Sequence, residues 1–116
     1  MMIVNDTMEM NEYQDKALTT AEFPVVGKPF IYPVLGLVGE AGEVAEKLKK
    51  VMRNDNGELN DDKRKDIAKE LGDVMWYLAI LAKELDLELN DIAEMNIAKL
   101  RDRKERGVIK SEGDNR

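Results

Sequence analysis

The sequence predicts an all-α protein, built as an antiparallel bundle of four helices. Two long stretches carry apolar residues at the three- and four-residue spacing of an amphipathic helix. Turn-forming residues separate these stretches from each other and from two shorter helical segments. A chain of 116 residues is long enough for one domain with a modest core, so the helices are expected to share that core.

The first expected helix spans about residues 11–20, with Tyr13 and Ala17 turned inward. A loop over residues 21–33 follows it, because prolines and a glycine interrupt regular structure there. The loop is also rich in aromatic residues. It therefore either covers a pocket or forms an ordinary packed connection.

The second and third helices are expected over residues 34–53 and from about residue 60 to residue 86. The segment Asn54-Asp55-Asn56-Gly57 ends the second helix, and Asn60, Asp61 or Asp62 caps the third. A short loop makes the two helices antiparallel neighbours. Their apolar stripes contain Leu37, Val38, Ala41, Val44, Ala45, Leu48, Val51 and Met52 in the second helix, and Ile67, Leu71, Val74, Met75, Leu78, Leu81, Ala82 and Leu85 in the third.

The fourth helix is expected to begin at Asn90 as its cap, to run to about Arg106 and to end at Gly107. Residues 1–107 then form the domain, and residues 108–116 form a polar C-terminal tail.

A repeated acidic pattern is the main chemical signal. Glu40 and Glu43 flank a glycine in the second helix, and Glu70 and Asp73 flank another in the third. Each pair falls on one side of its helix, along the border of the apolar stripe, so antiparallel packing brings four carboxylates together. So many like charges require a counterion, and a set of hard oxygen ligands favours Mg²⁺ or Mn²⁺. The alternative is ordinary surface spacing in a highly charged chain, but the repetition favours the metal site.

Polar and cationic residues suggest a second group of contacts. Asn96, Lys99 and Arg103 line one strip of the fourth helix, where they either bind phosphate or extend from the core border into water. Lys47 and Lys50 follow Glu43 on nearly the same side of the second helix.

Tyr77 follows Asp73 by one helical turn, close to the carboxylate border. It could stack on a base or hydrogen-bond a sugar, although core packing is the more frequent role of a helical aromatic residue.

Composition excludes several classes of function. The net charge of −6 argues against a general nucleic-acid-binding surface. The absence of Cys and His removes disulfides, thiolate sites, Ser-His-Asp chemistry and histidine-based zinc sites. No apolar segment is long enough to span a membrane and the first residues do not resemble a secretion signal, so we expect no membrane partner and a cytoplasmic protein.

The sequence resembles the MazG-like all-α nucleotide pyrophosphohydrolases over roughly residues 11–107. The matching elements are residues 32–44 (YPVLGLVGEAGEV), Lys49 and Lys50 with Arg53, residues 70–79 (ELGDVMWYLA), and residues 96–100 (NIAKL) with Arg103. The resemblance implies Mg²⁺-dependent cleavage of a nucleoside triphosphate, (d)NTP, to the monophosphate, (d)NMP, and pyrophosphate. It implies homodimers or homotetramers with active sites near the subunit interface.

The resemblance also suggests roles for individual residues. It implies that metal binding and catalysis are carried out by Glu40, Glu43, Glu70 and Asp73, with Glu43 the preferred acceptor of a proton from water. It also implies that the nucleotide or its phosphates are contacted by Lys50, Asn96, Lys99 and Arg103. One departure is Gly39, which stands where many relatives have a further acid. The dCTP pyrophosphatase-like branch of the family, which the sequence also resembles, tolerates a glycine there.

Two other functions remain open. The same fold could act on phosphoribosyl-ATP or a guanosine alarmone, or the chain could be a non-catalytic helical interaction module. Gly42 and Gly72 lie away from the main apolar stripes, where close packing must come from another surface. A homo-oligomer is therefore expected on the residues as well as on the resemblance.

Overall fold

The structure is a computed structural model that describes residues 7–107. This part of the chain forms four helices and no strand: α1 (Met10–Leu18), α2 (Ile31–Asn54), α3 (Asp61–Glu84) and α4 (Leu89–Glu105). The predicted all-α class with four helices is confirmed. The predicted tail over residues 108–116 lies outside the described residues.

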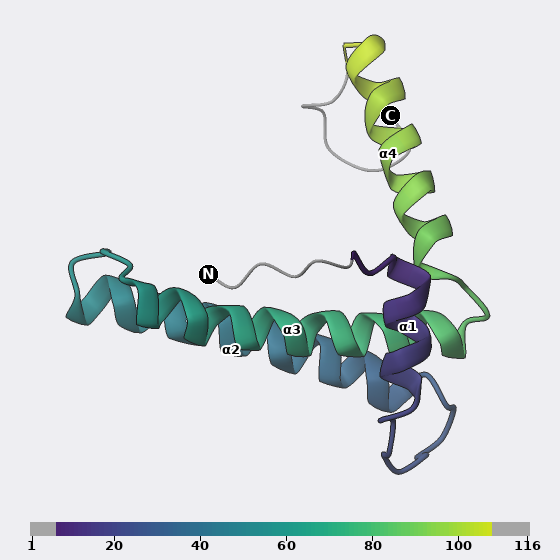
Figure 1. The fold of residues 1–116 in the computed structure, drawn as a ribbon, viewed down its shortest axis with the longest axis horizontal. Coiled ribbons are helices and arrows are strands. Elements are labelled where there is room, and N and C mark those ends of the chain that lie inside the picture. The colour runs from purple at the N-terminus through teal and green to yellow at the C-terminus, as the bar shows by residue number, and fades with distance from the viewer. Residues whose placement is uncertain (1–6, 108–116) are drawn as a thin grey trace.

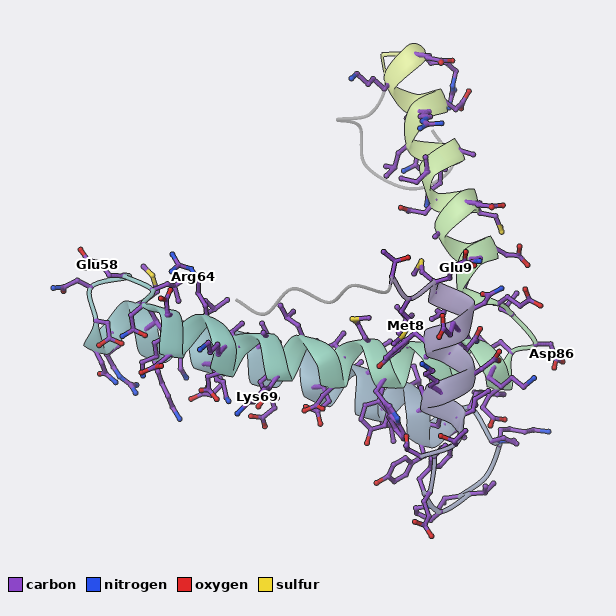
Figure 2. All side chains as sticks on the ribbon, viewed as in Figure 1. Met8, Glu9, Glu58, Arg64, Lys69 and Asp86 are labelled. Carbon is purple, nitrogen blue, oxygen red and sulfur yellow. The ribbon has the colours of Figure 1, made fainter. Side chains whose placement is uncertain are left out.

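Helices α2 and α3 form a long antiparallel pair that dominates the molecule (Figure 1). The predicted turn between them is confirmed, with Asn56 and Gly57 in the left-handed region at φ 54° and 77°. The Asn60 side chain caps α3, since its oxygen accepts a hydrogen bond of 2.8 Å from the Lys63 backbone N–H. Figure 2 shows Glu58 and Arg64 at this end of the pair and Asp86 at the opposite end.

Helix α2 begins earlier than predicted, at Ile31. The sequence prediction treated Pro33 as part of the preceding loop. Proline is tolerated in the first turn of a helix, where its missing N–H has no intrahelical partner. Pro33 is fully buried, so it contributes to packing at the start of α2.

The core lies where α1 crosses α3 and α4 begins. Its buried residues are Ala17, Ala79, Ile80, Ala82 and Leu89. The Trp76 indole N–H donates to the Thr20 hydroxyl at 2.8 Å, which joins α3 to the segment that follows α1. The packing is therefore concentrated at one end of the α2–α3 pair.

Helix α4 contacts α1 and then diverges from the α2–α3 pair (Figure 1). The prediction of a four-helix bundle within one chain was therefore wrong. The connector after α3 contains Asp86 at φ 59°, and the contacts of α1 with the start of α4 fix the direction in which α4 leaves.

The start of α4 is capped from α1. Gln14 Oε1 accepts from the Leu89 backbone N–H at 3.1 Å, and Asn11 Oδ1 accepts from that of Asn90 at 2.9 Å. Asn90 was predicted to be the cap, and this was wrong, because the helix already includes Leu89 and its first amides find acceptors in α1.

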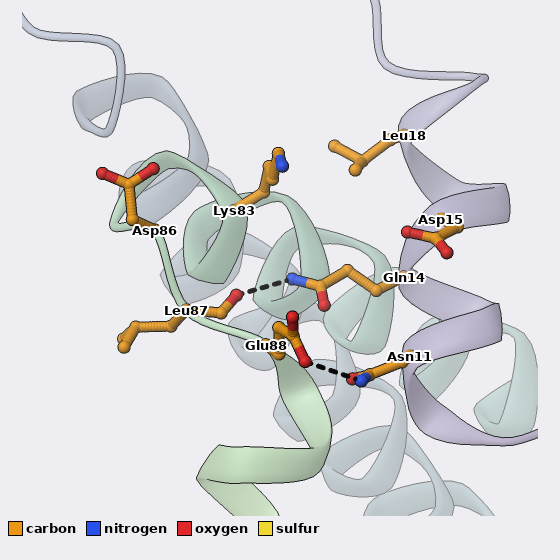
Figure 3. Close-up of a pocket in the computed structure, with 8 residues that line it drawn as sticks. All are labelled: Asn11, Gln14, Asp15, Leu18, Lys83, Asp86, Leu87 and Glu88. Carbon is orange, nitrogen blue, oxygen red and sulfur yellow. Dashed lines mark hydrogen bonds between the residues drawn. The ribbon is translucent and has the colours of Figure 1, made fainter.

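The same two side chains bind the connector between α3 and α4 (Figure 3). Gln14 Nε2 donates to the Leu87 carbonyl at 3.0 Å and to the Ala79 carbonyl at 3.2 Å, and Asn11 Nδ2 donates to Glu88 Oε2 at 2.9 Å. A buried amide that makes these bonds determines how three helices meet.

Many apolar side chains of the long pair are exposed. Leu35, Val38 and Met52 on α2, and Leu71 and Met75 on α3, are among the exposed large hydrophobic residues. Val38 and Met52 were predicted to lie in the apolar stripe of α2, but these residues are 68% and 67% exposed. No helix among the described residues is long and apolar enough to cross a membrane.

We predict that Gln14→Leu lowers the free energy of unfolding by about 2–3 kcal/mol. The substitution keeps a similar side-chain volume but leaves buried donors and acceptors without hydrogen-bond partners. Denaturant unfolding at fixed protein concentration measures this change. Asp15→Asn, on the exposed side of the same helix, is the control and should stay within about 0.5 kcal/mol. Equal stability of the two variants would show that the cap of α4 contributes little.

Candidate metal centre

The candidate site lies in the contact between α2 and α3. The helix positions that face each other there recur every three or four residues and are buried or half-buried. They are Pro33, Leu37, Glu40, Val44, Lys47 and Val51 on α2, and Ile67, Glu70, Val74, Tyr77 and Leu81 on α3. Glu40 and Glu70 therefore lie within the helix contact, whereas the sequence analysis placed them at its border.

Three of the four predicted acids converge. Glu40, Glu70 and Asp73 each offer a carboxylate oxygen, and these oxygens all lie within 4.8 Å of one another. Glu40 and Glu70 are half-buried and Asp73 is exposed, so the group opens to solvent on one side. Carboxylate oxygens from two helices form a hard donor set, which fits Mg²⁺ or Mn²⁺ with remaining positions open to water or phosphate.

The charges of this group affect its protonation. Burial raises the pKa of Glu40 above its usual value, and the negative charges of Asp73 and Glu70 raise it further. A hydrogen bond with Glu70 acts in the same direction. Metal-free Glu40 therefore keeps its proton to a higher pH than an ordinary glutamate does.

Glu43 lies outside the converging group. It is exposed, one helical turn beyond Glu40, and its charge makes only the smallest of the contributions that raise the pKa of Glu40. The structure therefore places Glu43 near the site but not among the three acids that meet. Its role as a ligand or as a base stays a prediction.

Lys47 is the cation that meets the acidic group. Its Nζ lies 3.0 Å from Glu70 Oε1 and 2.8 Å from Asp66 Oδ1. Hydrogen bonds to Asp66 and Glu70 raise the pKa of Lys47, so the ammonium remains charged. The sequence analysis favoured Lys50, which is exposed and lowers the pKa of Glu46 from a distance. Lys47 follows Glu40 by seven residues, or about two helical turns, so both lie on the same face of α2. This spacing was the sequence signal that Lys47 lies near the acids.

Tyr77 is half-buried on α3 beside the acids. Its ring lies against Gly36 of α2, where a Cβ would overlap the ring carbons. Burial raises the pKa of the Tyr77 hydroxyl, and the charges of Tyr32, Glu40 and Asp73 add to this effect. The hydroxyl therefore stays protonated and can donate a hydrogen bond near the carboxylates.

The predicted residues of α4 lie on a helix that diverges from the one that carries Glu70 and Asp73 (Figure 1). Asn96 is exposed, Lys99 is half-buried and Arg103 is buried, and all three belong to the helix that diverges from the α2–α3 pair (Figure 1). Their predicted contact with phosphate or nucleotide remains a prediction.

The pocket in Figure 3 lies elsewhere, between α1 and the connector that follows α3. It has a volume of about 250 Å³, but the amides of Asn11 and Gln14 that line it are engaged in holding α4. We therefore assign this pocket to the fold, and the converging carboxylates remain the candidate metal centre.

We predict that Glu40→Gln stabilises the metal-free protein at neutral pH. A raised pKa in the folded state means that ionised Glu40 costs stability once the pH exceeds its usual value of 4.5. The glutamine variant should melt at a higher temperature than the parent in EDTA at pH 7, and the difference should disappear near pH 4. Glu43→Gln is the control and should show a smaller change. A melting temperature that falls at pH 7 would contradict the electrostatic argument.

Two comparisons with known proteins match this chain. The sequence model of the MazG nucleotide pyrophosphohydrolase domain matches residues 33–108, which contain all four predicted acids. The Gene 37 protein of Mycobacterium phage L5 is 46% identical to this chain over 114 residues, covering 94% of this chain and 100% of the phage protein. No solved structure matches the chain. The chain therefore belongs to the family of MazG nucleotide pyrophosphohydrolase domains.

Proposed function

We propose that this protein is a Mg²⁺-dependent nucleoside triphosphate pyrophosphohydrolase, which cleaves (d)NTP to (d)NMP and pyrophosphate. The observation that carries the proposal is the convergence of Glu40, Glu70 and Asp73 from two antiparallel helices. Family membership supports the same reaction class. Mn²⁺ is the alternative ion, because it accepts the same oxygen ligands.

Each acid has a proposed role. Glu40, Glu70 and Asp73 hold the ion, and Glu43 either completes the ligand set or accepts the proton of the attacking water. Bound there, the ion would neutralise phosphate charge and would make a water molecule more acidic. The fixed carboxylates therefore serve both binding and orientation, and the reaction needs no Ser, Cys or His nucleophile.

The remaining predicted residues are proposed to hold the nucleotide. Lys50, Asn96, Lys99 and Arg103 are candidates for phosphate contacts. Tyr77 is the candidate for the base or sugar, since its ring and protonated hydroxyl lie beside the acids. Stacking against a ring accepts any base, so base preference depends on further contacts.

We propose that a second copy of the chain completes the site. Among residues 7–107, no atom lies within 4 Å of where a Cβ of Gly39, Gly42 or Gly72 would stand, other than those of neighbouring residues and of the helix backbone itself. Another helix can approach closely at these glycines, and the exposed apolar residues around them favour such burial. A partner would then bring the polar strip of its own α4 toward the acids of α2 and α3, the pair from which α4 of the same chain diverges.

We predict that incubation with a (d)NTP and Mg²⁺ yields stoichiometric monophosphate and pyrophosphate. Phosphorus NMR identifies both products, and a panel of nucleotides shows which base and sugar are preferred. Glu70→Gln and Asp73→Asn should each lower turnover at least about a hundredfold, because each removes a charged ligand. Asp62→Asn, an exposed acid of α3 away from the site, is the control and should retain activity.

The products of the reaction also distinguish the proposed function from its alternatives. A diphosphate with orthophosphate would contradict attack at the α-phosphate. Cleavage of phosphoribosyl-ATP or a guanosine alarmone alone would assign the same site a different substrate. No turnover and no metal binding would support a helical interaction module.

We predict that the active species is at least a dimer. Val38→Lys places a charge on the exposed apolar surface of α2 and should lower assembly and activity together. Val26→Lys is the matched control, because Val26 is 66% exposed and Val38 is 68% exposed, but Val26 lies in the loop before α2. Light scattering across a wide dilution range measures assembly. A fully active monomer of 13.2 kDa would contradict the proposal.

A further inference from the structure

Lys47 stands between two carboxylates of different kinds. Glu70 belongs to the candidate metal group and its side chain is 17% exposed, whereas Asp66 lies outside that group and its side chain is 52% exposed. Lys47 contacts both, and its own side chain is 28% exposed. The ammonium therefore has a partner inside the site and another at the solvent edge.

The contact with Glu70 opposes metal binding. Glu70 is half-buried, so its charge is poorly screened and its attraction for a cation is strong. A divalent ion at the converging oxygens and an ammonium at Glu70 Oε1 would share one carboxylate and repel each other. One of the two cations must weaken its hold on Glu70 when the other is present.

Asp66 provides the place to which Lys47 can withdraw. It precedes Glu70 by four residues on α3, so the two carboxylates lie one helical turn apart. Lys47 Nζ is already 2.8 Å from Asp66 Oδ1, so it can leave Glu70 without losing its other partner. The long flexible lysine side chain makes such a small displacement easy.

We propose that Lys47 is a positioning residue which neutralises and orients Glu70 in the metal-free protein and withdraws to Asp66 when a divalent ion binds. Asp66 then sets how strongly Lys47 competes with the metal. This inference rests on the metal site of the proposed function. It assigns a role to two residues that do not bind the metal themselves.

The test measures Mg²⁺ and Mn²⁺ binding by calorimetry on EDTA-stripped full-length protein, with no nucleotide. Lys47→Met keeps the apolar stem, removes the competing charge and should tighten binding about tenfold. Asp66→Asn leaves Lys47 with Glu70 alone and should weaken binding roughly threefold. Circular dichroism checks that the variants are folded.

Control variants test whether metal affinity changes because Lys47 changes its partner or only because the charge of the protein changes. Lys65→Met and Asp62→Asn make the same charge changes at exposed positions of α3, five and eight residues before Glu70, and should change affinity less. Asp66→Asn is also made in the Lys47→Met variant. There it should weaken metal binding no more than Asp62→Asn does, because no ammonium remains to compete for Glu70.

The outcomes distinguish this inference from the metal site itself. Unchanged or weaker binding by Lys47→Met overturns the inference while the site stands, and so does an Asp66→Asn effect that persists without Lys47. No binding by the parent protein overturns the metal site and the inference with it.

Discussion

Like charges placed between two packed helices are the constraint on which the structure depends. Glu40 and Glu70 occupy positions of the α2–α3 contact that apolar residues usually fill. Their repulsion opposes the packing that brings them together, and burial adds a cost for each ionised group. A cation beside these carboxylates therefore stabilises the pair. Lys47 supplies one such charge from within the chain, and a divalent ion would supply more.

This constraint explains where the core lies. Ala17, Ala79, Ile80 and Leu89 pack at the junction of α1, α3 and α4, far along the pair from the turn at Gly57. The acidic segment contributes little apolar burial, and large apolar residues nearby face outward. A ligand or a second copy that bound only the folded state would stabilise a chain with these features.

Local signals predicted the helices and turns well. The left-handed Asn56 and Gly57 and the Asn60 cap follow from residue type, and the convergence of Glu40, Glu70 and Asp73 follows from helical spacing and a short loop. The direction of α4 could not be predicted, because it depends on Asn11 and Gln14, more than 70 residues away along the chain. Periodicity gives a face of a helix but not which neighbour covers it.

The register of α2 against α3 links the site to the packing. Tyr77 lies against Gly36, and a side chain at Gly36 would overlap its ring, so the ring packs directly on the backbone of α2 there. Glu40 follows Gly36 by four residues and Asp73 precedes Tyr77 by four, which places the acids one helical turn from this close contact on both helices. Because the helices are antiparallel, that turn lies in the same direction from the contact. The glycine and the aromatic ring therefore fix the distance at which the carboxylates meet, and a chain that lost this contact would lose the geometry of the site while keeping every acid.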